Sequence, residues 1–173
     1  FDDQAAEFSC SDTILQQIWD LCKYSIKATT FAGIYVDGDR ERIPYEADAL
    51  INQLAHYCTD REFSLARRSH EYLLTHATWP TEWIMQSVII AWNDYLYTGD
   101  RRSLEQNYEL LRNKTLSALA DDDGFIRTDK DRLTPELYKS ICLEGQQLQD
   151  IVDWPKNERD GYVFTEVNTV VNA

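Results

Sequence analysis

The sequence has little of what most metal, cofactor and nucleotide sites are built from. Its 173 residues include four cysteines, three histidines and one methionine. The cysteines form no CxxC pair and no two histidines stand at metal-ligand spacing, which argues against a zinc site. No phosphate-binding glycine loop, dinucleotide fingerprint or serine-hydrolase elbow occurs. We therefore expect neither a metal nor a cofactor.

Positive charge is also scarce. The chain has 17 lysines and arginines against 30 aspartates and glutamates, a formal net charge of −13. Nucleic acids and anionic membrane surfaces attract basic patches, so we expect neither as a partner. No apolar run is long enough to span a bilayer, and no segment resembles a signal peptide. The acidity itself is most simply explained by solubility.

The two ends of the sequence suggest a piece of a larger protein. The chain begins abruptly at Phe1 and stops at Ala173 inside a predicted helix. A missing signal peptide then says little about the compartment, which the sequence leaves unknown. We favour a periplasmic or secreted location in a bacterium over the cytoplasm.

What the sequence does contain is a globular, mainly helical pattern. Hydrophobic residues make up 43% and aromatic residues 12%, enough for one domain with a core. Apolar residues at three-four spacing predict helices over about 12–29, 44–58, 60–74, 81–98 and 100–119, and a sixth after Thr165. Residues 125–163 lack this pattern and are predicted to form a long structured loop. Cys22 and Cys58 lie among apolar helical residues, so we expect them to be buried.

The short connections between these helices predict antiparallel helical hairpins, and hence an all-α fold. The helix over 81–98 is apolar almost all round, which predicts burial on several sides. A closed ring of hairpins, an (α/α)6 barrel, explains such a helix, because inner helices are covered on the outside. Six helices would make about half of that ring, a partial barrel.

Residues 35–48 concentrate the ionisable chemistry of the chain. Five carboxylates and two arginines stand in fourteen residues, together with Gly38 and Pro44, ahead of a predicted helix. Such a stretch is either a solvated turn or a carbohydrate-cleaving site. A calcium loop is a further alternative, but Arg42 stands where the sharp turn of an EF-hand needs glycine. Glu46 lies at the helix start, where the helix dipole favours acidic residues, and we leave it out of the site.

The chemistry of glycoside cleavage fits this density of carboxylates. An inverting glycosidase needs a protonated carboxylic acid on the leaving oxygen and a carboxylate base roughly 6.5–9.5 Å away. Arg40 and Arg42 favour the ionised form of Glu41, whereas the neighbouring carboxylates favour the protonated form. We therefore regard Glu41 as a candidate acid.

Tryptophans supply the other half of a sugar site, because the C–H faces of sugars pack on indole rings. Trp79, Trp83 and Trp154 lie at helix starts or in loops, where a barrel would open. Trp83 and Trp154 are the stronger candidates, and a hydrophobic plug under a loop is the alternative for each. Trp19 and Trp92 lie within helices and are expected in the core. The arginine pairs 67–68 and 101–102 are expected on solvent-facing helix surfaces.

Residues 37–48 also resemble a known signature. An Asp precedes an Arg-Glu pair, an aromatic residue follows the Glu by four positions and an Asp follows it by seven. These are Arg40-Glu41, Tyr45 and Asp48. The pattern resembles the acid-bearing signature of bacterial α-L-rhamnosidases of glycoside hydrolase family 78, whose catalytic domain is an (α/α)6 barrel of six hairpins.

The resemblance implies roles for individual residues. Glu41 would be the general acid, Asp37, Arg40 and Asp48 would hold sugar hydroxyls, and Tyr45 would lie in the site. Two departures stand out: the family usually has Trp where Tyr45 stands, and the leading Asp is nearer to the Glu than usual. Asp37 and Asp39 therefore compete for that role.

The resemblance covers the N-terminal half of such a barrel. In the family the base is a Glu of a later hairpin, which would lie beyond this sequence. Glu82, Asp153 and Glu166 are the carboxylates considered within it, but no spacing supports any of them. The expected partners are a rhamnoside and the remainder of the chain's own catalytic domain, and the isolated chain should not turn over substrate.

Two alternatives stay open: another (α/α)6 glycosidase with a different sugar, and a non-catalytic helical-hairpin interaction module. The enzyme hypothesis requires Asp37, Arg40, Glu41 and Asp48 to converge on one pocket with at least one tryptophan ring. The interaction-module hypothesis predicts that they point into solvent.

Overall fold

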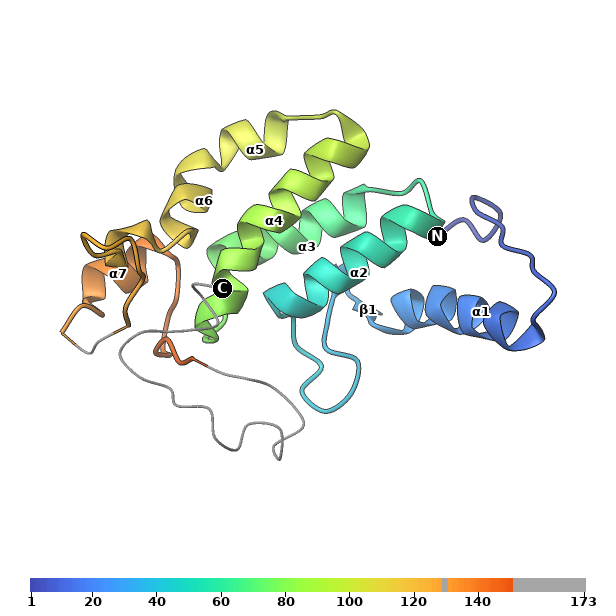
Figure 1. Ribbon diagram of the computed structural model, residues 1–173, viewed down its shortest axis with the longest axis horizontal. Helices are drawn as coiled ribbons and strands as arrows, with labels where there is room; N and C mark the ends of the chain where they lie inside the picture. Colours follow the sequence, from blue (N-terminus) through green and yellow to red (C-terminus); the bar gives the residue numbers. More distant parts are fainter. Residues whose placement is uncertain (129–130, 151–173) are drawn as a thin grey trace.

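The computed structural model describes residues 1–128 and 131–150, and in these residues the protein is all-α apart from one two-stranded hairpin (Figure 1). The elements, in chain order, are α1 (Thr13–Ala28), β1 (Thr30–Phe31), β2 (Ile34–Tyr35), α2 (Glu46–Thr59), α3 (Ser64–Thr75), α4 (Thr81–Thr98), α5 (Arg102–Gln106), α6 (Tyr108–Lys114), the 3-10 turn η1 (Ser117–Leu119) and α7 (Pro135–Ser140).

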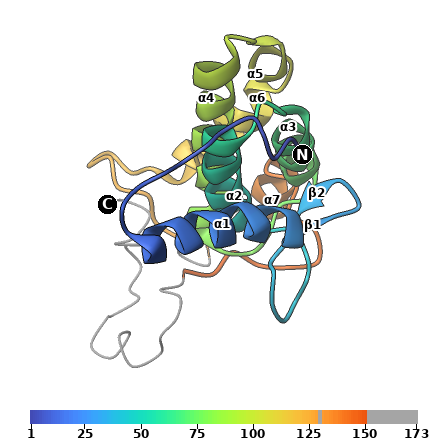
Figure 2. The same cartoon turned by 90° about the vertical axis from the view of Figure 1, so that its right-hand side faces the viewer.

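Helices α2, α3 and α4 form the centre of the structure and all contact one another. Short connections reverse the chain between them, so α2 and α4 begin at the same end, as Figure 1 shows. Figure 2 shows α1 crossing the near end, with the β1–β2 hairpin beside its last turn. The prediction of antiparallel helical hairpins is confirmed for this part of the chain.

Local signals explain where several helices begin and end. The Asp12 carboxylate accepts a hydrogen bond from the Ile14 N–H at 2.8 Å and caps α1, as the sequence suggests. Gly99 adopts the left-handed conformation that ends α4, with φ of 67°. The start of α3 differs from the predicted start at about residue 60: the helix begins after Phe63, and the Glu62 carboxylate accepts from the N–H groups of Ser64 and Leu65.

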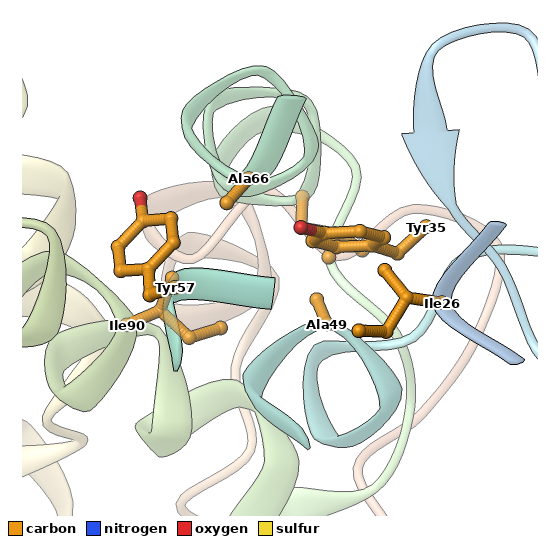
Figure 3. Packing of buried hydrophobic residues seen from close by; sticks show 7 residues of the cluster. Ile26, Tyr35, Ala49, Tyr57, Ala66 and Ile90 are labelled. Atoms are coloured by element: carbon orange, nitrogen blue, oxygen red, sulfur yellow. The ribbon is translucent and has the colours of Figure 1, made fainter. Parts of the chain in front are cut away.

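The first of two main hydrophobic clusters joins α1, β2 and the central helices. Figure 3 shows the Tyr35 ring facing Ile26 of α1 and Ala49 of α2, with Ala66 of α3 and Tyr57 nearby. Tyr35 is completely buried although its strand is only two residues long. This packing fixes the point from which the charged stretch departs.

The second cluster joins the start of α4 to the C-terminal part of the described chain. Ile84 of α4 packs with buried residues from the η1 region, α7 and the segment after it: Leu116, Leu119, Leu137, Ile141, Leu143 and Leu148. The start of α4 is therefore held by this cluster, while α2 packs along the same helix.

Two elements differ from the sequence expectation. The predicted helix over 100–119 is divided into α5, α6 and η1, because Asn107 ends α5 and Leu116 takes a left-handed conformation with φ of 54°. Residues 125–163, predicted as a loop, contain α7, whose six residues are too few to show helical periodicity. The predicted sixth helix lies outside the described residues.

Several apolar side chains expected in the core are exposed. Cys22 and Cys58 are exposed thiols, so the prediction of their burial is wrong; their sides of α1 and α2 face away from the described core. Helix α4 is buried along one side only, and Trp92 is 51% exposed, which contradicts its assignment to the core. Despite this apolar character, no helix in the described ranges has the length and hydropathy of a membrane span.

Candidate active site

The charged stretch forms a closed loop between β2 and α2. The Val36 N–H donates to the Thr29 carbonyl, and the Asp37 N–H donates to the Ile43 carbonyl, both at 2.8 Å, which closes the loop at its base. A Cβ atom at Gly38 would lie 2.6 Å from Thr29 Cγ2, so only glycine fits this approach. Figure 1 shows the loop projecting beyond the central helices at the start of α2.

A hydrogen-bonded chain of buried side chains fixes the stem of this loop. The Tyr35 hydroxyl lies 2.6 Å from His56 Nδ1, and His56 Nε2 lies 3.4 Å from Asp60 Oδ2. The Tyr35 N–H also donates to Ser69 Oγ of α3 at 2.9 Å. His56 and His70 are both buried. The loop thus departs from a rigid base.

Within the loop, the structure brings Asp37, Arg40 and Glu41 together. The Glu41 N–H donates to Asp37 Oδ2 at 3.1 Å, and Arg40 Nε donates to Glu41 Oε1 at 3.0 Å. Arg40 Nη2 also pairs with the same carboxylate. The side chain of Glu41 is 34% exposed and that of Arg40 is 74% exposed. Glu41 is therefore positioned by its neighbours and open to solvent on one side.

The electrostatics of these groups are coupled. Burial raises the pKa of the Asp37 carboxyl, but hydrogen bonds from Glu41 and from the backbone N–H groups of Asp39 and Arg42 outweigh this and hold the pKa below its usual value. The Glu41 carboxylate, by hydrogen bonding and by its charge, raises the pKa of Arg40. Asp37 is therefore an anion at neutral pH.

An aromatic pair stands beside this charged group. The Tyr45 ring meets the Trp83 ring edge to face, with centroids 5.3 Å apart and an angle of 80° between the planes. Burial raises the pKa of the Tyr45 hydroxyl, and the charges of Glu41, Asp37 and Asp48 raise it further. These three carboxylates therefore lie close enough to Tyr45 for their charges to act on its hydroxyl.

The enzyme hypothesis requires these charged residues to converge, and the described structure brings four of them within electrostatic reach of one aromatic residue. Tyr45 couples electrostatically to Asp37, Arg40, Glu41 and Asp48, and its ring contacts Trp83. Asp39 is exposed, and its backbone N–H forms a hydrogen bond with the Asp37 carboxylate. Glu82, considered as a base, accepts a hydrogen bond from the Trp83 indole N–H at 3.1 Å.

The remaining candidates lie elsewhere. Trp79 is half-buried, and its carbonyl accepts from the Gln149 N–H at 3.1 Å, so its backbone pairs with a second loop. Trp154, Asp153 and Glu166 lie outside the described residues. Arg67, expected on a solvent face, instead pairs with Asp94 at 2.9 Å, because α4 packs against that side of α3.

Sequence reasoning missed the environment of Glu46. The side chain is fully buried at the first position of α2, and its carboxylate accepts from the Thr78 N–H at 3.2 Å and from the Thr78 hydroxyl. The charge of Lys114, also fully buried, acts on it. A charge at a helix start is usual on sequence grounds, so no signal in the sequence revealed this burial.

No group of three or more histidine, cysteine, aspartate or glutamate side chains is arranged to hold a metal ion among residues 1–128 and 131–150. The calcium alternative for the charged stretch therefore gains no support from the described geometry.

A comparison with protein-family models matches residues 3–173 to the bacterial alpha-L-rhamnosidase 6 hairpin glycosidase domain. The chain belongs to this family. The all-α fold and its helical hairpins agree with a six-hairpin glycosidase domain, and membership indicates a glycosidase-type enzyme domain with a carbohydrate substrate. Comparisons with curated proteins and with solved structures found no match.

Proposed function

We propose that this chain is the acid-bearing part of a glycoside hydrolase that removes terminal α-L-rhamnose with inversion of configuration. The observation that carries the proposal is the position of Glu41. Its carboxylate accepts from Arg40 and is partly open to solvent, its backbone N–H donates to Asp37, and its charge acts on Tyr45 of the Tyr45–Trp83 ring pair. Family membership supplies the reaction class.

In the proposed mechanism Glu41 donates a proton to the oxygen of the leaving group. Asp37, Arg40 and Asp48 hold sugar hydroxyls by charge-assisted hydrogen bonds, and Tyr45 and Trp83 pack against the C–H face of the sugar. Trp154 is proposed as a further contact from the segment that follows residue 150. No metal or cofactor takes part.

The water-activating base is proposed to come from another hairpin of the same domain. Inversion needs roughly 6.5–9.5 Å between the two carboxyl groups, so they normally come from separate elements. Among the described carboxylates, Glu82 is engaged with Trp83, which does not favour it as the base. The chain would then form the N-terminal portion of an (α/α)6 domain and act with its remainder.

The anomer of the first product tests whether the reaction proceeds with inversion. Inversion of an α-rhamnoside releases β-L-rhamnose first, which proton NMR distinguishes from the α anomer before mutarotation. We expect this result from the complete hydrolase domain acting on an aryl α-L-rhamnoside. Initial release of α-L-rhamnose would contradict the inverting mechanism. Hydrolysis of aryl glycosides of another sugar in preference would favour the alternative of a different (α/α)6 glycosidase.

A pair of isosteric variants tests the choice of leading aspartate. The geometry favours Asp37, whose carboxylate contacts Glu41, over Asp39, which is exposed. We expect Asp37→Asn to lower kcat/KM by about a hundredfold or more, and Asp39→Asn to change it by less than about threefold, on the scale of one charge-assisted hydrogen bond. The reverse order would assign the role to Asp39.

A further inference from the structure

Two neighbouring residues at the start of α2 contact the chain around the start of α4. One contacts the connection between α3 and α4, and the other contacts α4 itself. Glu46 binds Thr78, which lies in this connection, through two hydrogen bonds. Tyr45, the residue before Glu46, contacts Trp83 in the first turn of α4. The same stretch of α2 therefore determines both where the connection lies and what the Trp83 ring faces.

Burial of the Glu46 carboxylate is costly, which argues for a specific role. Burial raises its pKa, opposed by the hydrogen bonds from Thr78 and by the charge of Lys114. Lys114 is itself desolvated, and its ammonium group donates to the Ile141 carbonyl at 2.9 Å. An apolar contact would join two helix ends at lower cost, since buried ion pairs are often no more stabilising than hydrophobic replacements.

What a carboxylate adds is orientation. Its two oxygens accept separately from the backbone N–H and the hydroxyl of Thr78, so the residue is held at two points. Trp83 follows Thr78 by five residues, and the intervening Thr81 starts α4. A shift of Thr78 would be passed directly to the first turn of α4, and hence to the Trp83 ring.

We propose that Glu46 is a positioning residue that holds the α3–α4 connection through Thr78 and so sets the Trp83 ring against Tyr45 beside Glu41. The proposal rests on the proposed function for its catalytic consequence, but its structural part does not. Glu46 does not contact substrate; it acts through Thr78 and Trp83.

Near-UV circular dichroism tests the structural part without any activity. The difference spectrum between the wild type and Trp83→Phe reports the coupled Tyr45–Trp83 rings. We expect Glu46→Ala to reduce this signal to less than half, Thr78→Val to reduce it in the same direction, and Glu46→Gln, which keeps one acceptor oxygen, to restore most of it.

Asp94→Asn is the matched control. Asp94 is a buried carboxylate that pairs with Arg67 and Tyr57, and it stands eleven residues beyond Trp83 on α4, roughly 16 Å along the helix. We expect this variant to lower the melting temperature as Glu46→Ala does but to leave the ring signal intact. Equal ring signals in Glu46→Ala, Thr78→Val and the wild type would overturn the proposal, as would loss of the signal in Asp94→Asn.

Kinetics in the complete hydrolase domain test the catalytic part. We expect Thr78→Val and Glu46→Ala to raise KM for an aryl rhamnoside by about three- to tenfold with kcat changed less, because sugar contact is weakened while Glu41 is intact, and we expect Glu46→Gln to stay close to the wild type. Unchanged KM with a lost ring signal would overturn the link to sugar binding. If the wild type hydrolyses no rhamnoside, the proposed function fails, and the ring signal still decides the role of Glu46.

Discussion

At the scale of single residues, buried polar groups are what the sequence does not reveal. The charged stretch around Glu41 is visible as a pattern because its residues are close in the chain. The environments of Glu46 and His70 are not visible in the sequence, because their partners are distant in the chain. Thr78 binds Glu46, and the charge of Lys114 acts on both residues. The sequence could therefore identify the candidate acid, but it could not identify the buried partners of Glu46 and His70.

His70 should make stability depend on pH. Burial, with a smaller contribution from the Lys114 charge, lowers the pKa of His70 to about 3 from its ordinary value of 6.5. Below pH 6.5 the unfolded chain binds a proton that the folded protein does not, so stability falls as pH falls. We expect a loss of about 2 kcal/mol between pH 7 and pH 5, measured by urea denaturation relative to His70→Leu.

His76 provides the control for this measurement. It is an exposed histidine stacked on Tyr72, with ring centroids 4.2 Å apart. His76→Asn should keep the pH dependence of the wild type, whereas His70→Leu should remove most of it. A wild-type slope that survives in His70→Leu would show that another group is responsible.

Gly38 should be required for steric reasons. A methyl group at this position would lie 2.6 Å from Thr29 Cγ2. We expect Gly38→Ala to cost about 1–3 kcal/mol, the usual penalty for overpacking, because the loop base must shift. Thr29→Ser removes Cγ2 but keeps the hydroxyl, so the double variant should recover most of this loss in a double-mutant cycle. Additive losses would contradict the steric explanation.

At the scale of elements, the helical pattern was predicted well and its burial poorly. Caps and turn residues such as Asp12 and Gly99 act locally, so they mark helix ends correctly. Apolar periodicity shows that a helix has an apolar face, but not which neighbour covers it. For this reason Cys58 and Trp92 were expected to be buried, although both are exposed. Helix α7 was not predicted because six residues are too few to show a helical pattern.

The ion pair between α3 and α4 should hold these two helices together. Arg67 Nε and Nη2 donate to the two oxygens of Asp94, which is 4% exposed. Arg67→Met should leave this buried carboxylate without its positively charged partner, at a cost on the order of 3 kcal/mol by chemical denaturation.

Arg101→Met is the matched comparison, since Arg101 pairs with Glu105 on the surface of α5. Exposed pairs contribute little, so its loss should stay below about 1 kcal/mol. Similar losses for the two arginine variants would contradict the assignment of Arg67 to a buried pair.

At the scale of the whole molecule, the all-α fold with helical hairpins followed from periodicity and short connections, and the family signature followed from residues 37–48. Both agree with the family match over residues 3–173. The position of the base could not be predicted, because that carboxylate is proposed to lie on another hairpin. The site proposed here is therefore one half of an acid–base pair.

The central claim is that Glu41 donates the proton to the leaving oxygen. It is tested most directly by comparing Glu41→Gln with the wild type in the complete hydrolase domain, on rhamnosides with poor and with good leaving groups. Loss of a general acid should lower kcat/KM by roughly a hundredfold or more for the poor leaving group, and much less for an activated aryl rhamnoside that needs no proton. Glu105→Gln, an exposed charge change on α5, should lower neither. An equal loss on both substrates, or substantial activity of Glu41→Gln on the poor leaving group, would contradict the assignment.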